Sequence, residues 1–213
     1  MTHLKSFARM TAATLAASGL VIALGACAPV LLGGAMVGGG FVATDRRTSG
    51  AQLEDEGIEL RANARLGDKG HFNVTSYNRQ VLLTGEVPSE QAKMQATEIV
   101  SKVENVRAVV NELAVAGNSS LSQRSADALV TGRIKAVLVD ARDLSSNAFK
   151  IVTERGVVYM MGRVTQREAN VATELIRGVS GVQRVVRVLE LITDEELKTT
   201  LPAPAASAAK PSV

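Results

Sequence analysis

The chain has 213 residues, of which 46% are hydrophobic but only 3% aromatic, so any core must be built from aliphatic side chains. The net charge of +3 falls to +1 if residues 1–26, which hold two basic residues and no acid, are removed as a leader. A chain this close to neutral, without aromatic residues interleaved among its basic ones, is not expected to bind nucleic acid. Its single cysteine excludes a disulfide within the chain.

The first 26 residues have the three parts of a secretory signal peptide. Lys5 and Arg9 give a positive start, residues 11–24 form an apolar stretch, and small residues precede Cys27. The run Leu-Gly-Ala-Cys at residues 24–27 resembles the lipobox of bacterial lipoproteins, whose cysteine accepts a diacylglyceryl group. We therefore expect cleavage before Cys27 and lipidation of that residue.

Residues 27–44 form the expected lipidated, glycine-rich tether. Since Ala28, rather than Asp, follows the cysteine, the lipoprotein resemblance implies the outer membrane, with the protein facing the periplasm. The alternative is an uncleaved membrane helix within the uncharged residues 10–44, which are long enough to span a bilayer. Seven glycines and Pro29 weaken that helix.

An internal repeat follows the tether. Residues 96–115 and 172–191 align without gaps and share eight identities, and residues 72–87 match residues 149–164 upstream. One residue is deleted between the two matching blocks. A repeat spacing of about 77 residues is too long for a solenoid. Each copy is therefore predicted to be a domain of its own.

Each copy is predicted to open with a short helix, because apolar residues recur every four positions. These residues are Ile58, Ala62 and Leu66 in the first copy and Val130, Ile134 and Leu138 in the second. The elements that follow are a strand (72–75; 149–153), a turn, a second strand (81–87; 157–164), a longer helix (89–103; 166–179) and a closing strand (108–115; 184–192). This α-β-β-α-β order predicts an α+β fold with two tandem domains, each a three-stranded sheet with two helices on one face.

The predicted boundaries are 45–116 for the first domain, 117–123 for a polar linker, 124–193 for the second domain and 194–213 for a disordered tail. Two acidic clusters lie near these boundaries. Residues 54–56 are interpreted as first-turn acids of a helix. Residues 194–196 are expected to cap a terminal helical turn rather than to bind metal.

Gly85 and Gly162 stand toward the ends of the second strands, and each copy closes on a Val-x-x-Val-x-Asn/Arg-x-Leu pattern. These features resemble the BON domain, and two such domains behind a lipobox resemble the DolP (YraP) class of outer-membrane lipoproteins. The strings at residues 43–48 and 160–169 add to the resemblance. It implies a non-catalytic protein without a cofactor, associated with anionic phospholipids, envelope integrity and cell-division sites.

The balance of charged residues predicts that the second copy is the one that contacts lipid. Residues 45–116 carry 9 basic and 11 acidic side chains, whereas residues 124–193 carry 11 and 7. Each basic residue near an anionic membrane contributes on the order of 1 kcal/mol of attraction. The candidate lipid-binding residues on the first helix of this copy are Leu129, Arg133, Lys135, Val137 and Arg124.

Within this set, Leu129, Arg133 and Val137 are expected to form one stripe beside the core stripe, where the apolar groups insert and the cation meets phosphate. Leu129 stands where similar proteins place an aromatic anchor. The plainer alternative is that Leu129 widens the core-facing stripe and the arginines are solvated.

A second hypothesis is a periplasmic protein-interaction module, with an outer-membrane assembly component or an osmotic-stress role, in which only the lipid anchor contacts membrane. An exposed apolar patch on residues 45–116, or a groove between the copies, would favour it. Catalysis is not expected, because Cys27 would be acylated, His71 is isolated, and no zinc spacing or phosphate loop is present.

Overall fold

The computed structural model describes residues 45–200. The predicted signal peptide, the lipidated Cys27, the tether and residues 201–213 lie outside the described residues. Within residues 45–200, every helix is too short or too polar to cross a bilayer.

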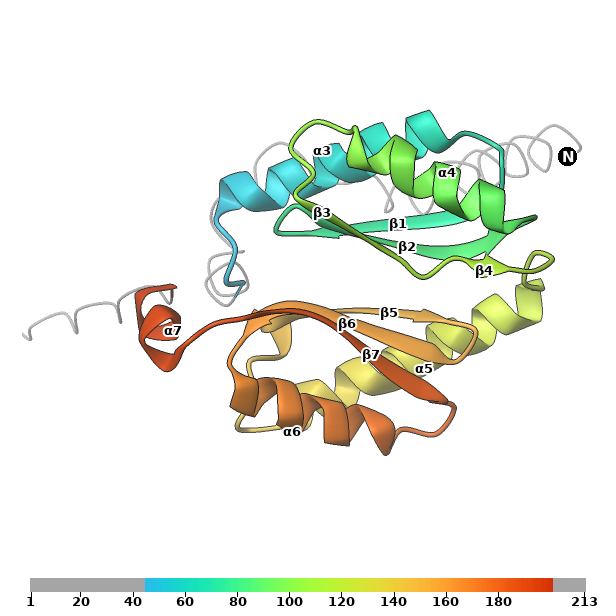
Figure 1. Cartoon of the computed structure of the whole chain (residues 1–213). Coiled ribbons are helices and arrows are strands. Elements are labelled where there is room, and N and C mark those ends of the chain that lie inside the picture. The colour runs from blue at the N-terminus through green and yellow to red at the C-terminus, as the bar shows by residue number, and fades with distance from the viewer. Residues whose placement is uncertain (1–44, 201–213) are drawn as a thin grey trace, which may run out of the picture. The chain divides into compact units, whose positions relative to one another are not determined.

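The first copy consists of α3 (Ser49–Leu66), β1 (His71–Tyr77), β2 (Gln80–Val87), α4 (Glu90–Ser101), β3 (Ala108–Asn111) and β4 (Ala114–Val115). β1 pairs antiparallel with β2. β3 and β4 both run parallel to β2, so they are two segments of one strand position. Both helices lie on the same face of this sheet (Figure 1).

The second copy repeats this arrangement with α5 (Leu121–Asp140), η2 (Ser146–Ala148), β5 (Phe149–Glu154), β6 (Val157–Val164), α6 (Gln166–Arg177) and β7 (Arg184–Leu191), followed by α7 (Asp194–Thr200). β6 is central, antiparallel to β5 and parallel to β7. Helices α5 and α6 cover one face (Figure 1). The predicted α+β fold, with three strand positions and two helices per copy, is confirmed.

Local sequence explains the two hairpins. Asn78 and Arg79 have φ of 50° and 65°, and Arg155 and Gly156 have φ of 53° and 73°. Positive φ at both central residues is the type I′ turn, whose twist matches that of the flanking strands.

The motif glycines are required by close backbone approach. A β-carbon on Gly85 would lie 2.0 Å from the His71 carbonyl oxygen, and one on Gly162 would lie 2.3 Å from that of Ala148. Gly85 pairs with Phe72 across its hairpin, and Gly162 pairs with Phe149 across its own. The same contact between the first two strands therefore accounts for both glycines.

Each copy has its own aliphatic core between helices and sheet. All six residues of the predicted helix stripes are buried, at 6% exposure or less. A third cluster joins the copies and contains Tyr77, Leu82, Tyr159, Met161 and Val188. On β2, Val81 and Leu83 belong to the first core and Leu82 to the joint cluster. Because side chains alternate along a strand, the sheet face turned away from the helices contacts the other copy.

Several predicted lengths and boundaries are wrong. The opening helices are not short: α3 has 18 residues and α5 has 20, whereas α4 and α6 have 12 each. α3 begins at Ser49, so residues 54–56 lie in its middle rather than its first turn. The buried stripe covers only the C-terminal part of each helix, so the apolar spacing did not indicate the turns that precede it.

The linker and the tail are both shorter than predicted. A capping box of Ser120 and Gln123 starts α5 at Leu121, within the predicted linker at residues 117–123. α7 occupies the first seven residues of the predicted disordered tail. The amide of Glu196 donates to Thr193 Oγ1, and the Thr193 amide donates to the Glu196 carboxylate. The residues 194–196 thus cap a helical turn, as expected.

Candidate functional site

One buried carboxylate sets the rotation of α5 about its axis. Asp127 accepts hydrogen bonds from the amides of Arg155 and Gly156 in the β5–β6 turn, at 2.7 and 2.8 Å. In the first copy, Asp55 accepts from the amides of Asn78 and Arg79 at the same two distances. Each opening helix is therefore tied to the hairpin of its own sheet, and one side of it always faces solvent.

The solvent-facing side of α5 carries no charge along its centre. Since residues three and four apart lie on one face, the outward line consists of Leu121, Ser125, Ala128, Leu129, Gly132, Ala136 and Val139, all of them exposed. Leu121, Leu129 and Val139 are 81%, 64% and 68% exposed. A helix whose buried and exposed sides are both apolar is unusual on a protein surface and indicates an interaction site.

Cations flank this apolar line. Arg124 and Lys135 lie along one side of it and Arg133 along the other, and all three are exposed. None of them forms an ion pair with the described residues. Arg133 reaches only the Ser180 carbonyl, at 3.3 Å. The one exposed acid on α5 is Asp140, its last residue.

Four of the five candidate residues thus lie on this surface, and Val137 does not. Val137 is half-buried and packs against the core of the second copy. It follows Val130 by two turns, which turns it toward the sheet. Leu121 and Val139 were not predicted from the sequence, although steps of three and four residues along the helix connect them to Leu129.

The first copy presents a contrasting surface. Leu53 and Leu60 on α3 are 71% and 73% exposed. α3 carries four acidic and two basic residues, however, whereas α5 carries two acidic and three basic ones. An anionic surface would be repelled by the first helix and attracted by the second.

Residues 45–48, here called the N-terminal arm, are fixed to the second copy. Arg46 is buried and donates to both carboxylate oxygens of Glu168, at 2.9 and 2.7 Å, and to the Arg163 carbonyl. Burial by itself would raise the pKa of Glu168, but the hydrogen bonds from Arg46 and Thr165 outweigh it and lower the pKa to about 2. Arg46 lies 122 positions before its partner, so this bidentate pair fixes the N-terminal arm to a distant part of the chain.

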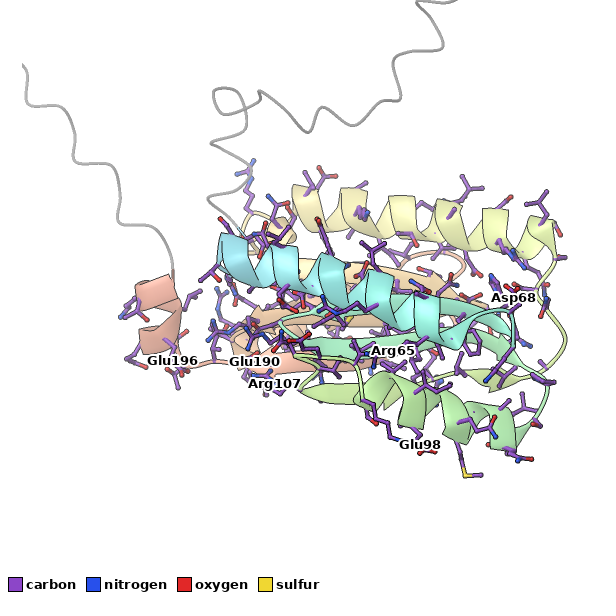
Figure 2. The ribbon with its side chains drawn as sticks, turned by 90° about the horizontal axis from the view of Figure 1, so that it is seen from above. Arg65, Asp68, Glu98, Arg107, Glu190 and Glu196 are labelled. Carbon is purple, nitrogen blue, oxygen red and sulfur yellow. The ribbon has the colours of Figure 1, made fainter. Side chains whose placement is uncertain are left out.

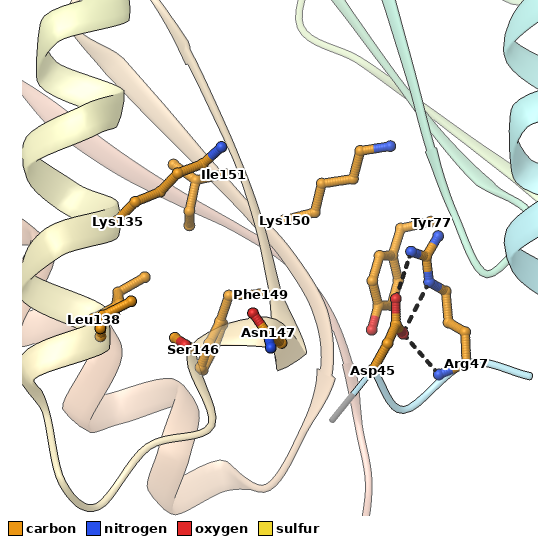
Figure 3. A pocket seen from close by; sticks show the side chains of 11 residues that line it. Asp45, Arg47, Tyr77, Lys135, Leu138, Ser146, Asn147, Phe149, Lys150 and Ile151 are labelled. Atoms are coloured by element: carbon orange, nitrogen blue, oxygen red, sulfur yellow. Dashed lines mark hydrogen bonds and ion pairs between the residues drawn. The ribbon is translucent and has the colours of Figure 1, made fainter. Parts of the chain in front are cut away.

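The next arginine of the arm binds the first copy. Arg47 donates to Asp45 and Asp55, at 2.8 Å in each case, and its guanidinium lies 4.3 Å above the Tyr77 ring (Figure 3). Burial by itself would lower the pKa of Arg47, but the hydrogen bonds to the two carboxylates outweigh it and raise the pKa above its ordinary value. The arm is therefore held to both copies by charged hydrogen bonds.

Further polar contacts join the copies. Lys150 donates to Glu59 at 2.8 Å, and Asn73 donates to Glu154 at 2.7 Å. Arg107 lies beside Glu190 at 3.1 Å (Figure 2). Burial raises the pKa of Glu154, and nearby carboxylates reinforce the effect against the Asn73 hydrogen bond.

His71 pairs with the buried Glu86, with 2.9 Å between Nδ1 and the carboxylate. No group of three or more potential metal ligands occurs in the part of the chain that the structure describes. The pair joins the first residue of β1 to β2, which indicates a structural role.

Comparisons with known proteins agree with this architecture. The BON domain model matches residues 54–117 and 126–193. The chain therefore belongs to the BON-domain family. It is 36% identical over 181 residues to the outer membrane lipoprotein DolP of Haemophilus influenzae, covering 82% of this chain and 93% of that protein. The chain is thus a dual BON-domain protein of the DolP class, lipid-anchored in the outer membrane.

Two further relatives are more distant. A 21 kDa hemolysin of Actinobacillus pleuropneumoniae is 30% identical over 70% of this chain and 79% of its own length. Osmotically-inducible protein Y of Escherichia coli is 28% identical over 62% of this chain and 70% of its own length.

Proposed function

We propose that this lipoprotein is a non-catalytic protein that binds anionic phospholipid through the outward face of α5. The observation that carries the proposal is the uncharged line from Leu121 to Val139, flanked by three cations that have no ion-pair partner among residues 45–200. Leucine and valine side chains would enter the boundary between headgroups and acyl chains, while the cations meet phosphates. Acylation of Cys27 would supply the permanent anchor, and α5 the second contact.

A role in envelope integrity at division sites follows from the DolP-class resemblance and forms part of the same proposal. Anionic lipid bound by α5 would concentrate the anchored protein wherever such lipid is enriched. The extra attraction is on the order of 1 kcal/mol for each basic residue near the surface.

Vesicle sedimentation tests the proposal. We would use the leaderless chain carrying Cys27→Ser, which lacks acyl chains, with phosphatidylcholine vesicles and with vesicles that also contain phosphatidylglycerol. Binding is expected only to the anionic vesicles and should weaken as salt screens the cations. Leu129→Asp should abolish it, and Arg133→Glu should lower it by about 2 kcal/mol, close to thirty-fold.

The matched control is Leu60→Asp, which places the same charge at an equally exposed leucine on α3. This variant should bind like the parent chain. Equal losses in Leu60→Asp and Leu129→Asp, or no binding to anionic vesicles at low salt, would contradict the proposal.

The second candidate is a protein-interaction module. Leu53 and Leu60 on α3 favour it, because they form an exposed apolar surface on the first BON domain. An outer-membrane assembly component is the kind of partner this module would bind. Loss of envelope integrity in cells that carry Leu60→Asp, with vesicle binding intact, would support this second activity.

A further inference from the structure

A pocket of about 500 Å³ lies beside the C-terminal half of α5. Its walls come from α5, from β5 and from the N-terminal arm (Figure 3). Lys135 and Val139 belong both to this lining and to the exposed surface of α5. The pocket is therefore continuous with the proposed lipid-binding face.

One part of the lining is apolar. Leu138, Phe149 and Ile151 contribute to it (Figure 3). Phe149 and Ile151 are each 8% exposed. Such a wall would accept hydrocarbon more readily than a polar group.

The other part is cationic. Lys135, Lys150 and Arg47 line the pocket together with one carboxylate, Asp45, which is bound to Arg47. Lys135 has no ion-pair partner among residues 45–200. Lys150 donates to Glu59 and to the Ser76 carbonyl, which uses two of the three donors of its ammonium group. Asp45 and Asp55 pair with Arg47, and Glu59 pairs with Lys150. The pocket thus offers an anion one cation without a carboxylate partner among residues 45–200, Lys135, and the third donor of Lys150.

The pocket also lies beside the first residue that the structure describes. Asp45 is the first described residue, and the Arg46–Glu168 pair holds it there. Seventeen residues separate Asp45 from Cys27, a span of at most about 60 Å when fully extended. A lipid anchor on Cys27 would thus hold this opening within about 60 Å of the membrane surface, a distance at which the pocket can reach lipid.

We propose that the pocket binds the headgroup of a single anionic phospholipid. Lys135 and Lys150 contact its phosphodiester, and its glycerol and first acyl carbons lie against Leu138, Phe149 and Ile151. This inference rests on the proposed function of α5 and extends it: α5 adsorbs to the bilayer, and the pocket recognises one lipid molecule within it. A phospholipid is preferred over a free phosphate because the anion site adjoins an apolar wall.

The experiment separates the pocket from the surface by using a lipid that forms no bilayer. The leaderless Cys27→Ser chain is titrated with dihexanoyl phosphatidylglycerol below its micelle concentration and followed by calorimetry and by amide chemical shifts. Saturable binding is expected, with the largest shifts at Lys135 and at residues 146–151. Dihexanoyl phosphatidylcholine and inorganic phosphate should each bind far more weakly.

Two variants locate the site. Lys150→Gln removes one cation and should weaken binding about five-fold, whereas Lys102→Gln, which removes a lysine from another glutamate pair, should not. Ser146→Phe narrows the pocket without touching the Lys150 contacts and should reduce binding at least as much. Thermal melting confirms that each variant is folded.

The outcomes distinguish the two proposals. Vesicle binding without binding of the short-chain lipid would overturn the pocket and leave α5 as the lipid surface. Short-chain binding without vesicle binding would support the pocket and overturn the proposed function of α5. Equal affinity for inorganic phosphate, or unchanged affinity in both Lys150→Gln and Ser146→Phe, would also overturn the pocket.

Discussion

Arg46 and Glu168 form the most buried ion pair described, with side chains 2% and 5% exposed. Two further groups satisfy this carboxylate, the amide and the hydroxyl of Thr165. A buried charge of this kind is stabilising only while its partner is present, because the remaining charge would otherwise lie unpaired in a poorly solvated place. The pair therefore links the N-terminal arm to the second BON domain.

The first prediction concerns that pair. Glu168→Gln keeps an oxygen able to cap α6 but leaves Arg46 buried without a counter-charge. We expect the free energy of unfolding to fall by roughly 3–5 kcal/mol. Urea denaturation measures this free energy of unfolding. Glu174→Gln breaks an exposed pair with Arg177 and should cost less than about 1 kcal/mol.

Acid titration checks the same pair independently. The pKa of Glu168 is about 2 in the folded chain and near 4.3 when unfolded. A lowered folded pKa stabilises the protein above the unfolded value, and this stability is lost as the pH falls from about 4 toward 2. Glu168→Gln should lack this component of the acid dependence. Parallel curves for the parent and the variant would contradict the assignment.

Glu154 has the opposite shift. Burial raises its pKa, and the charges of Glu86 and Asp127 add to the effect against the hydrogen bond from Asn73 and the charge of His71. A raised folded pKa gives stability that is complete at acid pH and is lost as the pH rises through the folded value.

The second prediction follows from this shift. Glu154→Gln retains an oxygen for the Asn73 amide and removes the charge. The variant should melt at a higher temperature than the parent at neutral pH, and the difference should vanish below about pH 4. A lower melting temperature at neutral pH would show that the ionised carboxylate is needed.

At the scale of elements, the two opening helices share their geometry and differ in their chemistry. Both are tied to a type I′ turn by an aspartate, and both present leucines to solvent. The charges beside those leucines differ, since α3 is acidic and α5 is basic. The repeat has thus kept one scaffold with two distinct exposed surfaces.

The third prediction tests the aspartate. Asp127→Ala leaves the Arg155 and Gly156 amides without their acceptor and should cost about 1–3 kcal/mol of stability. It should also weaken vesicle binding, because α5 loses its fixed rotation. Asp140→Ala removes an exposed acid from the same helix and should leave the melting temperature within a few degrees.

At the scale of the whole described unit, the joint cluster couples the two domains. Tyr77 and Leu82 of the first domain pack with Tyr159, Met161 and Val188 of the second. Ion pairs surround this cluster, including Lys150–Glu59 and Arg107–Glu190. Domains joined by an apolar interface and by partly exposed polar contacts around it should unfold together rather than move independently.

The fourth prediction is that the parent chain unfolds in a single calorimetric transition. Leu82→Asp places a charge in the joint cluster and leaves both domain cores unchanged, so two transitions should appear. Leu191→Asp, at a 55% exposed residue of β7, should retain one. Two transitions in the parent would show that the interface is too weak to couple the domains.

The sequence by itself determined whatever depends on local pattern or on repetition. Four-residue spacing located the buried stripes of α3 and α5, the break between two successive strands located each hairpin turn, and the repeat established two copies of one fold. The difference in charge between the copies also led to the prediction that α5 is the lipid-binding helix. Its error at Val137 arose because a helical stripe was drawn before the position of the core was known.

Only the tertiary structure decided which distant residues meet. Nothing near Arg46 in sequence marks Glu168 as its partner, and nothing near Lys150 marks Glu59 as the acceptor of its ammonium group. Such pairs have no period and no fixed spacing, because they arise only when the arm and the two copies pack together. The repeat specifies each domain locally, whereas the joint cluster and the N-terminal arm depend on contacts between residues far apart in the chain.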